Sequence, residues 1–119
     1  MLQQMELPLQ DRKILTLTKV RAADLAKFIH HKYTLEHFDE LFHFGWDHLQ
    51  PAMLRLEGNG NTPEVSDGRH RVSEMVLRNP DYLVPTVITW EWMHVNTVLK
   101  AVRSHYNKPN ASNYATLIL

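Results

Sequence analysis

The residues best suited to chemistry occupy positions 67–71, which read Asp-Gly-Arg-His-Arg and directly precede a stretch of helical apolar periodicity. Gly68 permits a sharp bend, and Asp67 is of a type that caps helices through its side chain. The pattern therefore predicts a helix beginning at Arg69. Basic residues oppose the positive end of a helix dipole, at about 0.3–1 kcal/mol each, unless an anion joins them. A phosphate would meet free N–H groups and guanidinium forks at one point, so we predict an anion site.

The alternative is an ordinary Asp-Gly turn whose basic residues are simply solvated. If the turn does hold a nucleotide phosphate, phosphoryl transfer also needs a group that positions or deprotonates the nucleophile. Asp67 and His70 lie in the turn itself, and we predict them as the catalytic residues. The earlier carboxylates Glu36, Asp39 and Glu40 are weaker candidates, because no motif singles out any of them.

Composition limits the class of protein. The chain has 119 residues, 44% hydrophobic and 22% charged, which fits one globular domain spanning residues 1–119. The 13 Lys and Arg residues balance the 13 Asp and Glu residues, so charge does not support DNA as the main partner. The absence of cysteine excludes disulfides and thiol catalysis. No apolar run approaches the roughly 18 residues of a membrane span and no signal-peptide pattern opens the chain, so we expect a cytoplasmic protein without a membrane partner.

Histidines are frequent, with 8 in the chain, and several fall between positions 30 and 48. A zinc site needs three or four ligands that converge from different elements. His30 and His31 are adjacent and point apart, while His37 and His43 share no helix face, and no HExxH spacing exists. We therefore predict no metal site and interpret these histidines as polar and boundary residues.

Hydrophobic periodicity predicts an alternation of short strands and helices. The predicted strands are residues 13–20, 52–56, 62–66 and 83–89, the middle two joined by a hairpin loop at 57–61. The predicted helices are residues 21–32, a helix from Thr34 to about Gly45, a helix from Arg69 to Arg78, and residues 91–105. Pro85 favours an edge position for its strand or a position at the first residue of the strand. The apolar residues 114–119 are either a last strand or a segment that docks on a partner, including a second copy of the chain.

Aromatic side chains offer a further kind of contact. Four of them could stack on a nucleobase, although such positions more often belong to the core: Trp46, Trp90, Trp92 and Tyr106. If residues 90–92 are extended, at most one of the two tryptophans there faces inward.

The order of motifs between residues 45 and 88 resembles that of the ParB/sulfiredoxin superfamily. Gln50-Pro51 precedes a strand and hairpin, the turn at 67–71 opens a helix, and Val84-Pro85 lies in the next strand. The resemblance implies an α+β fold, a small mixed sheet with surrounding helices. It also implies that the motif turn binds a nucleotide, CTP, ATP or ADP, with Mg²⁺. The binding residues implied by the resemblance are Gln50, Gly68, Arg69, His70 and Arg71.

Three departures limit what the resemblance implies. Sulfiredoxins place their reactive cysteine just before the His-Arg pair, where this chain has Arg69, so that chemistry is excluded. Partition-type ParB proteins have GERR where this chain has Gly-Arg-His-Arg, and they continue into a DNA-binding domain for which these residues leave no room. The pattern is closest to small free-standing members, which include nucleotide hydrolases, nucleases and a free-serine kinase.

The predicted function is therefore a ParB-like domain that binds a nucleotide or another phosphate ligand, as an NTP hydrolase or phosphotransferase using the turn at 67–71. The first alternative is a non-catalytic interaction protein or inhibitor, such as a mobile-element regulator, on the same scaffold. The second alternative is a ParB-like nuclease, which the neutral charge and the lack of a metal-holding carboxylate pair weaken.

Overall fold

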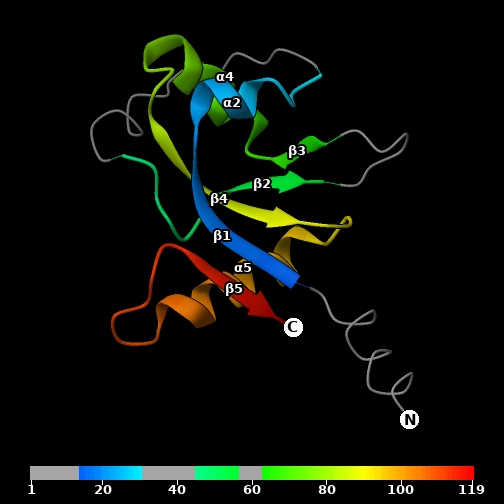
Figure 1. Cartoon of the computed structure of the whole chain (residues 1–119), viewed down its shortest axis with the longest axis vertical. Helices are drawn as coiled ribbons and strands as arrows, with labels where there is room; N and C mark the ends of the chain where they lie inside the picture. Colours follow the sequence, from blue (N-terminus) through cyan, green and yellow to red (C-terminus); the bar gives the residue numbers. More distant parts are fainter. Residues whose placement is uncertain (1–13, 31–44, 57–62) are drawn as a thin grey trace.

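Five strands form one mixed sheet in the computed structural model, which describes residues 14–30, 45–56 and 63–119 (Figure 1). The strands are β1 (Ile14–Arg21), β2 (Ala52–Arg55), β3 (Glu64–Asp67), β4 (Leu83–Thr89) and β5 (Ala115–Ile118). Their order across the sheet is β3-β2-β4-β1-β5, and only β2 and β4 run parallel to each other. The described helices are α2 (Ala22–Ala26), α4 (Arg69–Arg78) and α5 (Val95–Tyr106). The predicted α+β class, with a mixed sheet and surrounding helices, is confirmed.

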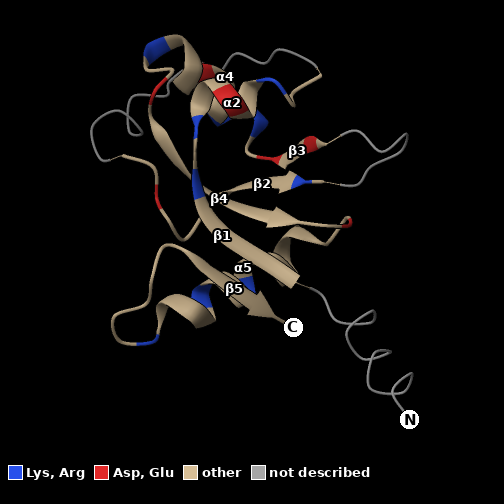
Figure 2. Cartoon of the chain, in the orientation of Figure 1, with Lys and Arg blue, Asp and Glu red and all other residues tan. Residues whose placement is uncertain are grey.

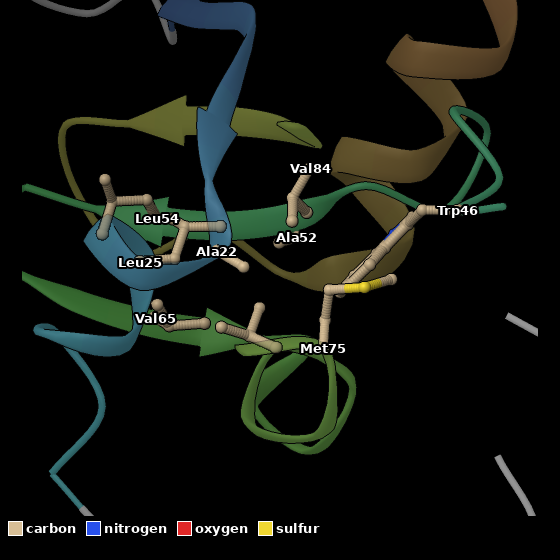
Figure 3. Close-up of a cluster of buried hydrophobic side chains, with 9 residues drawn as sticks. Ala22, Leu25, Trp46, Ala52, Leu54, Val65, Met75 and Val84 are labelled. Carbon is tan, nitrogen blue, oxygen red and sulfur yellow. The ribbon is translucent and has the colours of Figure 1, made fainter. Parts of the chain in front are cut away.

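The sheet separates two hydrophobic clusters, because side chains alternate between the faces along each strand. On one face, α2 and α4 pack against β2, β3 and β4 (Figure 3). The buried residues of this cluster are Ala22, Leu25, Trp46, Ala52, Leu54, Val65, Val72, Met75 and Val84. On the other face, α5 packs against the sheet, and the buried residues there are Leu15, Leu17, Met53, Val87, Val98 and Val102. Apolar burial on both faces holds the strand ends, and hence the turn after β3, in place.

The strand pattern was predicted closely, but the position of β4 was not. β4 covers residues 83–89 as predicted, yet it is the central strand of the sheet, so the expected edge position is wrong. Pro85 pairs with Lys19 of β1, whereas pairing with β2 begins one residue later, at Thr86 opposite Ala52. The proline is tolerated because it lies at the end of the ladder shared with β2, where its missing N–H is not needed.

Two helices differ from their predicted bounds for local reasons. α2 ends at Ala26 rather than near position 32, because the carbonyl of Phe28 accepts a hydrogen bond from the amide of Val65, 3.0 Å away on β3. α5 begins at Val95 rather than at position 91, because the side chain of His94 accepts from the amide of Asn96 and caps the helix.

Some predictions fall on parts of the chain that the structure does not describe. The helix from Thr34, the hairpin loop at 57–61, and the carboxylates Glu36, Asp39 and Glu40 lie outside the described residues. Among the aromatic residues, Trp46 is buried in the core, whereas Trp90 and Trp92 are both exposed. Within the described ranges, no helix is long and apolar enough to cross a membrane.

Candidate functional site

The turn between β3 and α4 forms because residue 68 adopts a backbone conformation that glycine favours. β3 ends at Asp67, Gly68 has a φ of 87°, and α4 begins at Arg69 as predicted. A Cβ atom at position 68 would lie 3.2 Å from the Cα of Ala52 on the neighbouring strand β2. Glycine is therefore favoured twice, by its positive φ and by the close approach of β2.

The predicted helix cap is wrong. Gly68 stands at the N-cap of α4, and no side chain caps the helix with a hydrogen bond. Asp67 is instead the last residue of β3, where it pairs with Met53 across the strands. The first turn of α4 contains no acidic residue and carries Arg69, His70 and Arg71. No carboxylate in that turn offsets the positive end of the helix dipole. The charge arrangement from which the anion site was predicted is therefore present.

Arg71 connects α4 to the segment that precedes β2. Its Nη1 donates to the main-chain carbonyl oxygen of Gln50 at 2.9 Å, and its guanidinium lies 4.7 Å from the ring centroid of Trp46. The indole Nε1 of Trp46 donates to the same carbonyl at 2.9 Å. Gln50, predicted as a binding residue, thus contributes its carbonyl oxygen to the positioning of Arg71. Its side chain is not among the groups that line the turn.

The segment that holds Trp46 is itself fixed by a tyrosine that follows α4. The amide of Trp46 donates to the hydroxyl of Tyr82 at 2.9 Å, and Gly45, with a φ of 78°, packs against the same hydroxyl. Asp47 then accepts from the amide of Leu49 at 2.9 Å and closes a short turn. The sequence predicted neither this role of Tyr82 nor the Trp46–Arg71 contact, because both depend on residues distant in the chain.

Burial changes the electrostatics of Arg71. Loss of solvent lowers the pKa of Arg71 below its usual value, and the nearby carboxylates of Asp67 and Asp47 oppose that shift. The guanidinium still carries its charge at neutral pH, since the starting pKa of arginine is far above 7. Within the described ranges, no carboxylate lies close enough to Arg71 to form an ion pair. The charge is therefore partly desolvated and only partly compensated.

An open depression of about 350 Å³ lies at the start of α4 and is lined by Asp67, Gly68, Arg69, His70 and Arg71. The structure thus brings both predicted catalytic residues and four of the five predicted binding residues to one surface. Charges of both signs meet here, because β3 carries acidic residues and α4 carries basic ones (Figure 2).

Metal ligands do not gather in the part of the chain that the structure describes. No group of three His, Asp or Glu side chains within those residues could hold a metal ion, and His31, His37 and His43 lie outside them. In the comparisons with known proteins, no family model, no curated protein and no solved structure matches the chain.

Proposed function

We propose that the turn at residues 67–71 binds the phosphate group of a nucleotide or of another phosphorylated small molecule. The observation that carries this proposal is the guanidinium of Arg71, which is partly buried and whose charge Asp67 and Asp47 compensate only in part, at a depression where α4 begins. A phosphate would compensate that charge and interact with the positive end of the helix dipole. Gln50 and Trp46 hold the guanidinium in place, so little conformational entropy is lost when a ligand binds.

The family to which we assign the domain is the ParB/sulfiredoxin superfamily. The spatial arrangement of the motif residues supports this assignment. Gln50 and Pro51 lead into β2, the turn at 67–71 follows β3, and the two are joined by the Arg71–Gln50 hydrogen bond. Val84 and Pro85 lie in β4, directly beside β2. In this assignment, the turn at 67–71 contacts the phosphate, and the buried Pro51, Val84 and Pro85 lie in, or directly before, the strands that support the turn.

In the catalytic form of the proposal, the ligand is CTP, ATP or ADP with Mg²⁺, and the reaction is hydrolysis or phosphoryl transfer. Among the described residues, Asp67 is the only carboxylate that lines the depression, and Mg²⁺ commonly binds one or two carboxylates together with phosphate oxygens. Asp67 would serve as a Mg²⁺ ligand or accept the proton of the attacking hydroxyl, and His70 would donate a hydrogen bond to the phosphate or leaving group.

A second candidate function is a non-catalytic interaction protein or inhibitor on the same scaffold. The observation that favours it is the contact of Arg71 with Gln50 and Trp46, which gives the arginine a structural role without any ligand. In that case the domain would bind a partner through its surface and would turn over no nucleotide. The nuclease alternative is favoured by no contact in the structure and is opposed by the formal net charge of +0.

Isothermal titration separates these functions. The purified chain is titrated with CTP, ATP, ADP and inorganic phosphate, each with and without Mg²⁺, and nucleotide turnover is followed in parallel. Arg69→Gln removes a charge from the first turn of α4, and Arg78→Gln removes the same charge from the last turn of the same helix. We expect Arg69→Gln to weaken nucleotide binding by about five- to tenfold and Arg78→Gln to leave it unchanged.

Two results would decide against the catalytic form or the whole proposal. Binding without turnover of any nucleotide would leave phosphate binding intact and reject Asp67 and His70 as catalytic residues. The absence of heat with every ligand, in a chain that unfolds cooperatively and is therefore folded, would reject the phosphate site and leave the interaction protein.

A further inference from the structure

The outer edge of β5 offers unpaired main-chain groups. β5 is the last strand of the sheet, paired with β1 on one side, and no other described strand pairs with it (Figure 1). An open edge of this kind presents a row of N–H and C=O groups that another extended chain can complete.

The side chains of β5 lack the features that usually protect an edge strand. Residues 114–119 read Tyr-Ala-Thr-Leu-Ile-Leu and contain no charged residue and no proline. Tyr114, Ile118 and Leu119 are exposed, at 59%, 57% and 46% of their surface. Ala115 and Leu117 point to the opposite side and pack against the core beneath α5. Without charge, proline or bulge, the edge is open to strand addition.

A groove runs beside this edge, between β5 and α5. It has a volume of about 250 Å³, and its lining includes Leu117, Leu119 and Ala101 together with the basic residue Lys108. A neighbouring hollow on the outer face of α5 is lined by Lys100 and Arg103. The groove thus combines apolar side chains with Lys108, and two further basic residues lie in the neighbouring hollow on α5.

The basic residues of α5 and of the loop that follows it have no acidic residue near them in the sequence. No Asp or Glu follows Glu91, whereas Lys100, Arg103 and Lys108 lie within that final segment (Figure 2). The charge near the edge is therefore positive, although the chain as a whole has a formal net charge of +0. Such a surface favours an acidic partner and repels a basic one.

We propose that β5 and the α5–β5 groove form a docking surface for an extended acidic peptide segment of a partner protein, which adds to the sheet beside β5. Its backbone pairs with β5, its apolar side chains enter the groove, and its carboxylates face Lys108. A second copy of this chain fits less well, because β5-to-β5 pairing about a two-fold axis would bring the two basic α5 helices toward each other. An added strand buries little surface, so we expect a weak complex that salt weakens further.

Fluorescence anisotropy tests the proposal with the full chain and a short labelled peptide in which Glu and Val alternate. We expect saturable binding of this peptide, and no binding when Lys replaces each Glu or when alternate backbone nitrogens are methylated. Lys108→Glu should weaken binding by about tenfold. Lys27→Glu, which reverses an exposed charge beside α2 on the opposite face of the sheet, should leave binding unchanged.

Four results would overturn the proposal. The first is no saturable binding of the Glu-Val peptide by the wild-type chain. The second is equal binding of the methylated peptide, which excludes strand addition. The third is a dimer in sedimentation equilibrium that Ile118→Lys dissociates, which makes a second copy the occupant. The fourth is displacement of the peptide by oligothymidylate with equal or tighter affinity, which makes nucleic acid the occupant.

Discussion

The guanidinium of Arg71 lies 4.7 Å from the centroid of the Trp46 ring, and both side chains donate to the carbonyl oxygen of Gln50. This contact ties the first turn of α4 to the segment that precedes β2. Because Trp46 is buried at 6% exposure, the arginine rests on a fixed surface. The candidate phosphate site and one of the two hydrophobic clusters are therefore physically continuous.

Arg71→Lys should lower both stability and ligand affinity. The sequence alone predicts that this change leaves stability almost unchanged, whereas the contacts with Trp46 and Gln50 predict a loss of about 1–2 kcal/mol in the free energy of unfolding. Nucleotide affinity should fall by about 1–3 kcal/mol, because lysine cannot reproduce the planar fork. Urea unfolding and titration measure the two effects. Arg103→Lys on the exposed face of α5 is the control and should change neither.

Gly68→Ala should destabilise the domain by about 1–3 kcal/mol, because the new Cβ atom must be accommodated at positive φ beside Ala52. Gly68→Asn introduces the same Cβ atom, but asparagine tolerates the left-handed conformation better. We therefore expect the asparagine variant to unfold at a higher urea concentration than the alanine variant. Equal midpoints for wild type and Gly68→Ala would show that the turn does not have this geometry.

Substitutions of Met75 and Leu77 test which face of α4 packs against the sheet. Met75 is 1% exposed within the cluster beneath the helix, whereas Leu77 is 71% exposed. Met75→Ala should cost about 2–5 kcal/mol and Leu77→Ala less than about 0.5 kcal/mol in denaturant unfolding. Similar losses for both variants would contradict the packing of α4 on the sheet.

The environment of Tyr106 predicts that the stability of the fold decreases at alkaline pH. Loss of solvent raises the pKa of Tyr106 above its usual value. The hydroxyl therefore ionises more readily in the unfolded chain, so its stabilising contribution is complete below about pH 10 and is lost as pH rises through the folded pKa. Thermal unfolding across that range should show a decline in stability that is smaller in Tyr106→Phe. An identical decline in both chains would rule out this contribution of Tyr106.

Local patterns in the sequence were enough to predict much of the fold. Alternation predicted β1, an apolar run of strand length predicted β4, and the Asp-Gly pair followed by helical periodicity predicted the start of α4 at Arg69. These elements form largely where local preference and burial agree. The exceptions arise from long-range contacts. α2 ends early because Val65 hydrogen-bonds to Phe28, and Pro85 lies in a central strand because the β2 ladder begins only after it.

The residues that line the candidate site could be predicted from the sequence, but the contacts that hold them in place could not. The turn residues 67–71 are contiguous, so their charge misfit at a helix start is visible in the sequence. Trp46 and Tyr82 reach the site from other parts of the chain, and nothing in their local sequence indicates that they do. Asp67 was misassigned as the cap because the bend at Gly68 places the glycine, and not the aspartate, at the N-cap.

The most direct test of phosphate binding is a ¹H–¹⁵N spectrum of the labelled chain during titration with CTP, ATP and inorganic phosphate at low salt. The account predicts saturable shifts of the main-chain amides of Gly68, Arg69, His70 and Arg71, and of the indole N–H of Trp46 that shares the Gln50 carbonyl with Arg71. The chemical shifts of amides at the far end of α4, near Arg78, should not change. Unchanged chemical shifts of the amides at 68–71 in a folded chain would contradict phosphate binding at this turn. Saturable shifts confined to the basic face of α5 would contradict it as well.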